Sequence, residues 1–155
     1  MERIPITRKG YQTLKSEFEN LKSVERPKNI QAIEEARSHG DLSENAEYAA
    51  AKERQSFIEG RLGELGYKLG NAEIIDDDNL PRDRAVFASK VLLENIDTGD
   101  IVQYKLVGPE ESNITNGRIS IASPLGKAII GKKPGDEITL EAPVGRRVYE
   151  LIKIF

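Results

Sequence analysis

Apolar residues in the first half of the chain recur at the three- and four-residue spacing of a helix that packs against another helix. They are Leu14, Phe18, Leu21, Ile30, Ile33 and Ala36. Pro27 interrupts this stripe, because proline has no backbone N–H and its ring crowds the preceding helical turn. The spacing therefore predicts one helix, kinked near Pro27, that runs from about Thr7, a favoured N-cap residue, to Ser38.

A second apolar pattern follows with a clear seven-residue repeat. Its two rows are Tyr48, Gln55, Leu62 and Leu69, and Ala51, Ile58, Leu65 and Ala72. Two rows at this spacing specify a partner helix, and the short connection makes that partner the first helix, antiparallel to it. We predict a second helix from Leu42 or Ser43 to near Asn71. Glycines at four positions should soften its proximal half: Gly60, Gly63, Gly66 and Gly70.

The period changes to that of strands in the second half. Strands are predicted at 86–89, 91–95, 101–107, 118–122, 137–141 and 147–154, with a short helix from Pro124 that stops at Gly131. The fold class is therefore α+β: a long N-terminal antiparallel coiled-coil hairpin, followed by a small, mostly β domain. The predicted domains are 1–75 for the hairpin, with its tip at 38–48, a linker at 76–84, and 85–155 for the globular part.

Composition excludes several classes of chemistry. The 155 residues include no cysteine and one histidine, so a disulfide framework, a thiol nucleophile and a multi-histidine zinc site are all excluded. The net charge of −3 argues against broad duplex binding, which requires many cations facing phosphates. No apolar run approaches the roughly 20 residues that span a bilayer, and the N-terminus lacks the apolar core of a signal peptide. We therefore expect a cytoplasmic protein.

The most informative stretch is the predicted tip, where carboxylates stand at the chain reversal. Asp41 and Glu44 lie three residues apart, which places both on one face at a helix start. One interpretation is a capping box, with Asp41 as the N-cap of the second helix; Ser43 is a rival cap. The spacing alone favours this interpretation over a functional site. Gly40 suits the left-handed position after the first helix.

The alternative interpretation is a site for a hard divalent cation. Mg²⁺ prefers oxygen ligands, keeps several waters, and is usually held by one or two carboxylates together with phosphates. Asp41 and Glu44 alone would bind it weakly. A partner that already holds a metal would have to complete the site. Glu47, one turn further along, is a weaker candidate and fits a solvated surface charge.

Several segments together resemble a known family. The tip sequence Gly40 to Tyr48 (GDLSENAEY), the opening IPIT at 4–7, KSVERP at 22–27, SPLGKA at 123–128 and GKKPGD at 131–136 are similar to those of the bacterial Gre-type transcript-cleavage and elongation factors, the GreA branch in particular. The resemblance extends over the whole chain. It raises the expectation of a functional tip well above what the spacing gave.

The resemblance implies a fold and a role for the tip. It implies a coiled coil that enters the RNA polymerase secondary channel, and a C-terminal domain with an FK506-binding-protein-like fold. It also implies that Asp41 and Glu44 help to hold a second Mg²⁺ while the polymerase's own site cleaves the 3′ end of RNA in a backtracked complex. The chain would then be no enzyme itself. Its partners would be RNA polymerase and the nascent RNA, and we expect a monomer when free.

The resemblance also suggests roles for other tip residues. Arg37, Lys52 and Arg54 are candidates to face the extruded RNA, although they fit equally well as solvated flanks of a coiled coil. Gly40, Ser43, Asn45 and Tyr48 are expected to support the tip. Rival functions are an inhibitory regulator that binds the same channel, a chaperone-like coiled-coil scaffold whose carboxylates are only caps, and a prolyl isomerase. Fold alone does not give function, and the second half carries no obvious aromatic-lined pocket.

Overall fold

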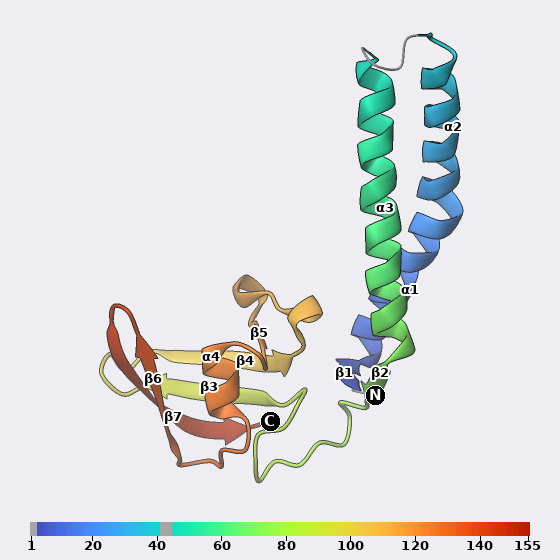
Figure 1. Ribbon diagram of the computed structural model, residues 1–155. Coiled ribbons are helices and arrows are strands. Elements are labelled where there is room, and N and C mark those ends of the chain that lie inside the picture. The colour runs from blue at the N-terminus through green and yellow to red at the C-terminus, as the bar shows by residue number, and fades with distance from the viewer. Residues whose placement is uncertain (1–2, 41–44) are drawn as a thin grey trace. The chain divides into compact units, whose positions relative to one another are not determined.

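The computed structural model describes residues 3–40 and 45–155 (Figure 1). They divide into two compact units, which we describe separately. Of the described residues, the first unit contains 3–4, 11–40 and 45–72, and the second contains 5–10 and 73–155. The second unit thus includes a segment from the very start of the chain, an assignment that sequence position alone does not suggest.

The first predicted helix is present, with a π-helical insert. Thr7 caps it as expected: its Oγ1 accepts a hydrogen bond from the backbone N–H of Gly10 at 3.0 Å. Helical backbone then continues through α1 (Arg8–Asn20), the π-helical η1 (Leu21–Glu25) and α2 (Arg26–Arg37). Figure 1 shows these pieces as one blue run of helix that lies alongside α3.

The π-helical insert explains how the chain accommodates Pro27. The N–H of Arg26 donates to the carbonyl of Leu21, five residues earlier, where an α-helix would use the fourth. Proline in the first turn of α2 has no N–H to give, and the wider turn before it makes room for the ring. The interruption that the sequence predicts at Pro27 is therefore a local π turn.

This insert shifts the buried stripe of the first helix by one position. The prediction for Ile30 was wrong: 46% of its surface is exposed, whereas its neighbour Asn29 is buried. A regular helix would repeat the buried position of Leu21 at 28, 32 and 35. One extra residue in the turn moves these positions to 29, 33 and 36, so the seam includes Asn29 and not Ile30. Ile33 and Ala36 are buried as predicted.

The second helix, α3 (Ala46–Gly70), begins later than predicted. Asn45 is its N-cap, with extended backbone and a side-chain oxygen that accepts from the N–H of Tyr48. The hypothesis that Asp41 or Ser43 caps this helix was therefore wrong, because asparagine next to the helix-forming run from Ala46 already supplies the acceptor that the first turn needs.

Contacts across the two helices run in opposite directions along the chain, so the hairpin is antiparallel. In order, the paired residues are Glu17 with Arg61, Arg26 with Glu59, Asn29 with Ala51, and Ala36 with Asn45. The seam of α3 is filled by Ala51, Ile58, Leu62 and Leu65, all buried as the heptads predict. The 25 residues of α3 span about 37 Å at 1.5 Å per residue.

The second unit is built on a five-stranded sheet with the order β5-β4-β3-β7-β6. Its strands are β3 (Lys90–Asn95), β4 (Ile101–Val107), β5 (Arg118–Ser120), β6 (Glu137–Ala142) and β7 (Gly145–Ile154). All neighbours are antiparallel except β4 and β5. A bulge between Leu92 and Leu93 shifts the register against β7. The mostly β second half is therefore confirmed.

One short helix, α4 (Pro124–Ile129), packs on this sheet. Its N-cap is Ser123, as predicted, whose Oγ accepts from the N–H of Gly126. Gly126 lies so close to β5 that a Cβ added there would collide with the carbonyl oxygen of Ser120. The core beneath α4 consists of Ala85, Val91, Leu93, Leu106, Ile119, Ile129, Ile138, Leu151 and Ile154.

Two further predictions in the second half needed correction. The segment 86–89 is a turn and not a strand: Ala88 has a positive φ of 73° and its N–H donates to the carbonyl of Leu106. No strand was predicted between the end of the second helix near Asn71 and the linker at 76–84. The structure has β2 there (Ala72–Ile75), and it pairs with β1 (Ile4–Thr7). Pairing partners that are far apart in sequence are invisible to a local pattern.

Among the helices of the described residues, none combines the length and the apolar character that a bilayer crossing demands.

Candidate functional site: the tip of the helical hairpin

The end of α2 is closed by a turn that leads into the tip. The N–H of Ser38 donates to the carbonyls of Glu34 and Glu35, and its Oγ donates to Glu35 at 2.6 Å. Gly40 then has a φ of 102°, and its N–H donates to the carbonyl of Arg37. The left-handed conformation predicted for Gly40 is confirmed, and only glycine adopts it without strain.

Asn45 begins the other side of the tip and makes two hydrogen bonds through one amide. Its Oδ1 accepts from the N–H of Tyr48 at 3.1 Å, which caps α3. Its Nδ2 donates to the carbonyl of Ala36 in α2 at 2.6 Å. The sequence indicated Asn45 only as general support. The sequence could have identified Asn45 as the N-cap, because asparagine is among the residues most favoured there. The hydrogen bond to Ala36 could not be predicted from the sequence.

Two further contacts join the helices at the tip. The guanidinium of Arg37 lies 6.0 Å from the ring centroid of Tyr48, within the range of a cation–π interaction. Nδ1 of His39 lies 3.4 Å from a carboxylate oxygen of Glu47, and both side chains are more than half exposed. An exposed ion pair contributes little, so Glu47 fits the surface charge that the sequence suggested.

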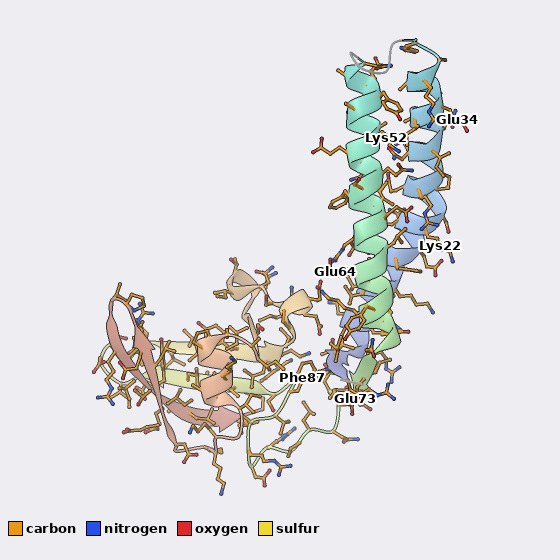
Figure 2. All side chains as sticks on the ribbon, viewed as in Figure 1. Lys22, Glu34, Lys52, Glu64, Glu73 and Phe87 are labelled. Carbon is orange, nitrogen blue, oxygen red and sulfur yellow. The ribbon has the colours of Figure 1, made fainter. Side chains whose placement is uncertain are left out.

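The two other candidate RNA-facing residues lie on exposed parts of α3. Nζ of Lys52 donates to the side-chain oxygen of Gln55 at 2.9 Å. Arg54 makes an ion pair with Glu25 at 3.7 Å and lies 5.2 Å from the ring centroid of Phe57. Figure 2 shows Lys52 in the distal half of α3, on the same end of the hairpin as Glu34 of α2. Both cations are accessible to a polyanion that approaches this end of the hairpin.

The predicted metal ligands Asp41 and Glu44, together with Ser43, lie outside the described residues. Their role as metal ligands therefore stays a prediction. The structure does show the two ends between which they stand in the sequence, Gly40 and Asn45. The tip thus presents accessible cations at its flanks, with the two candidate carboxylates between them in the sequence.

A second acidic group lies in the second unit, where the carboxylates of Asp76, Asp77 and Asp78 are close together and exposed. A cation is already supplied from the protein: Nζ of Lys105 lies 2.7 Å from Asp77. The hydrogen bond from Lys105 lowers the pKa of the Asp77 carboxyl below its ordinary value. An internal ammonium therefore already neutralises part of this group.

Comparisons of the sequence with known families match both halves. Residues 4–74 match the family described as "Transcription elongation factor, N-terminal", and residues 80–155 match "Transcription elongation factor, GreA/GreB, C-term". Together the two matches cover nearly the whole chain.

Individual relatives agree with the family matches. Transcription elongation factor GreA of Hyphomonas neptunium (strain ATCC 15444) is 53% identical over 154 residues, 99% of this chain and 98% of that protein. The factor of the same name from Syntrophobacter fumaroxidans (strain DSM 10017 / MPOB) is 51% identical, with 99% of each covered. Among solved structures, that of GreA factor homolog 1 of Thermus thermophilus has 28% sequence identity to this chain, covers 99% of each chain, and superposes with a TM-score of 0.46. By its sequence, the chain belongs to the GreA/GreB family of transcription elongation factors.

Proposed function

We propose that this GreA-type elongation factor binds RNA polymerase through its secondary channel and stimulates the polymerase's Mg²⁺-dependent cleavage of the 3′ end of RNA in backtracked complexes. The main support is the family relationship over the full chain together with the hairpin. A pair of helices whose second member spans about 37 Å is long and narrow enough to deliver its tip into a channel.

The chemistry proposed for the tip is the donation of ligands to another protein's active centre. Carboxylate oxygens are the donors that Mg²⁺ prefers, so Asp41 and Glu44 suit it chemically, and a bound Mg²⁺ would supply charge neutralisation and an activated water. Two carboxylates are too few for tight binding by the free protein. The factor is therefore not itself the catalyst, and the polymerase contributes the remaining ligands.

The flanking cations of the tip fit the same proposal. Arg37, Lys52 and Arg54 are exposed. They would offset the repulsion between an acidic protein and RNA by contacting phosphates near the cleaved end. Arg37 and Arg54 lie within cation–π distance of the rings of Tyr48 and Phe57, at 6.0 and 5.2 Å from the ring centroids. Contact with the nascent RNA would thus be local and made only within the complex.

Further features of the proposal follow from the family resemblance. We propose an FK506-binding-protein-like fold for the second unit, a monomeric free protein, and action in the cytoplasm, where polymerase works. An inhibitory regulator that binds the same channel remains the second candidate. The presence of Asp41 and Glu44 in the GDLSENAEY sequence favours cleavage over inhibition.

The test uses stalled, backtracked polymerase complexes with labelled RNA and Mg²⁺. We expect the wild-type chain to release short 3′ fragments, and the double variant Asp41→Asn, Glu44→Gln to bind polymerase while losing nearly all of this stimulation. A double variant as active as wild type would exclude the metal-ligand role. Wild-type protein that binds polymerase but slows RNA synthesis without releasing fragments would identify the inhibitor instead.

A further inference from the structure

Among the described residues, the side-chain amide of Asn45 makes the shortest polar contact between the two helices at the tip. Its Nδ2 lies 2.6 Å from the carbonyl oxygen of Ala36, in the last turn of α2. Its Oδ1 lies 3.1 Å from the backbone nitrogen of Tyr48, in the first turn of α3. The carbonyl of Ala36 can only accept and the N–H of Tyr48 can only donate. The two bonds therefore fix which end of the Asn45 amide faces each helix.

The other links at this end of the hairpin are weaker. The contact between His39 and Glu47 joins side chains that are 57% and 71% exposed, and such exposed contacts contribute little. The cation–π contact of Arg37 with Tyr48 is at the outer limit of its range, at 6.0 Å. The bonds of Asn45 are partly buried and therefore better protected from competition by water.

We propose that Asn45 is a positioning residue for transcript cleavage. By joining the last turn of α2 to the first turn of α3, it sets the separation of the two chain ends that flank Asp41 and Glu44. This inference rests on the proposed function. The consequence for rate is large in principle, because a displacement of reacting groups by about 1 Å can cost about 100-fold in rate.

The two bonds of Asn45 can be separated by substitution. Serine at this position keeps an acceptor for the N–H of Tyr48, as Ser123 does for Gly126 at the start of α4. It has no amide nitrogen with which to reach Ala36. Asn45→Ser therefore removes the link between the helices and retains the cap, whereas Asn45→Ala removes both.

A second substitution separates the effect of the lost link from the effect of the helix stability that Asn45→Ala also loses. Gly70, the last residue of α3, has nothing within 4 Å of the position that a Cβ would take. Gly70→Ala therefore adds helix stability far from the tip. The variant Asn45→Ala, Gly70→Ala restores stability lost with the cap without restoring the link.

The link is measured directly through a pair of spin labels. The chain contains no cysteine, so cysteines introduced at the exposed Glu34 of α2 and Glu53 of α3 can be labelled specifically. The distribution of the distance between the labels reports how firmly the helices are joined near the tip. This measurement is made on the free 155-residue chain and needs no polymerase.

We expect Asn45→Ser to lower the thermal midpoint by only a few degrees, because it loses one hydrogen bond and keeps the cap. It should broaden the distance distribution and lower cleavage at saturating factor by about an order of magnitude. The factor concentration for half-maximal effect should stay the same, and the Mg²⁺ concentration for half-maximal cleavage should rise. Asn45→Ala, Gly70→Ala should show the same loss of cleavage at wild-type stability.

Two results would overturn the inference: a distance distribution and cleavage rate in Asn45→Ser that match wild type, or full recovery of cleavage when Gly70→Ala restores stability to Asn45→Ala. A wild-type protein that fails to stimulate cleavage would overturn the proposed function, and with it the role of Asn45 in cleavage. The distance distributions would still decide separately whether the amide joins the helices.

Discussion

At the scale of single residues, Asn29 is an unusual component of the hairpin seam. It is buried, and its Nδ2 donates to the carbonyl of Ala51 across the interface at 3.0 Å. A polar residue in such a seam favours one register of the helices at a cost in stability. The carbonyl of Ala51 lies inside α3, so it also has the helical N–H four residues later as a donor.

We expect Asn29→Leu to raise the free energy of unfolding of the hairpin by about 1 kcal/mol, because buried apolar surface replaces a buried amide while Ala51 keeps a helical partner. Chemical denaturation monitored by circular dichroism measures this. Lys28→Leu, on the exposed face next to it, is the matched control and should change stability by less than about 0.5 kcal/mol. A lower stability for Asn29→Leu would show that its hydrogen bond outweighs the apolar gain.

At the scale of elements, the glycines of α3 have room for a side chain, whereas the glycine of α4 does not. An ideal Cβ at Gly60 or Gly63 meets nothing within 4 Å, so packing does not require glycine there. A Cβ at Gly126 would collide with the backbone of Ser120. The expected softness of proximal α3 is therefore an intrinsic cost of backbone entropy, which a methyl group would remove.

Gly60→Ala and Gly63→Ala should each stabilise the hairpin by up to about 1 kcal/mol, and should slow amide hydrogen exchange in proximal α3 relative to the amides near Ala51. Gly126→Ala is the opposite case and should destabilise the second unit. Exchange rates in proximal α3 that already match those near Ala51 in wild type would contradict the softness we infer.

The ion pair between α1 and α3 links the stability of the hairpin to pH. Arg61 donates two hydrogen bonds to the carboxylate of Glu17, at 2.7 and 2.9 Å, and this bonding lowers the pKa of Glu17 below its ordinary value. A carboxyl whose pKa is lowered in the folded state stabilises that state above its unfolded pKa of about 4.3. The stabilisation is lost as the pH falls through the lower, folded pKa.

The thermal midpoint of wild type should therefore fall as the pH drops from about 5 to 3, with part of the fall due to Glu17. Glu17→Gln cannot titrate, so its midpoint should be lower than that of wild type at neutral pH and should converge with it in acid. Parallel curves for the two proteins over this range would show that the pair has no net effect.

At the scale of the whole molecule, Glu111 is one of the contacts that hold Pro5–Gly10 in the second unit, beside the pairing of β1 with β2. Its carboxylate accepts from the hydroxyl of Thr7 at 2.5 Å and from the N–H of Thr7 at 3.3 Å. A Cβ at Gly10 would collide with the Glu111 carboxylate. Negative charge here also suits the N-terminal end of α1.

Glu111→Ala should loosen the segment at Thr7 to Gly10 while the pairing of β1 with β2 remains. The amide of Gly10, bonded to the Oγ1 of Thr7, should then exchange with solvent faster than in wild type. Amides of the sheet core, such as that of Leu93, provide the internal reference because they should not change. Unchanged exchange at Gly10 would show that the cap of Thr7 holds without the carboxylate.

The sequence by itself determined the long helices and most strands, because periodicity reports directly which face of a segment is buried. The antiparallel hairpin, the buried Ala51, Ile58, Leu62 and Leu65 of α3, the caps at Thr7 and Ser123 and the left-handed Gly40 were all predictable. The role of Asp41 and Glu44 came from spacing and resemblance, and it stays a prediction.

Only the tertiary structure decided features that depend on partners distant in sequence. The π turn before Pro27 adds one residue between the buried Leu21 and the next seam positions, which are therefore Asn29, Ile33 and Ala36. The spacing of apolar residues does not show such an insertion, and it pointed to Ile30 instead. Segment 86–89 turns because the N–H of Ala88 meets Leu106. Asn45 looks like any helix cap in the sequence, and its second bond exists only because the hairpin brings Ala36 within 2.6 Å of it.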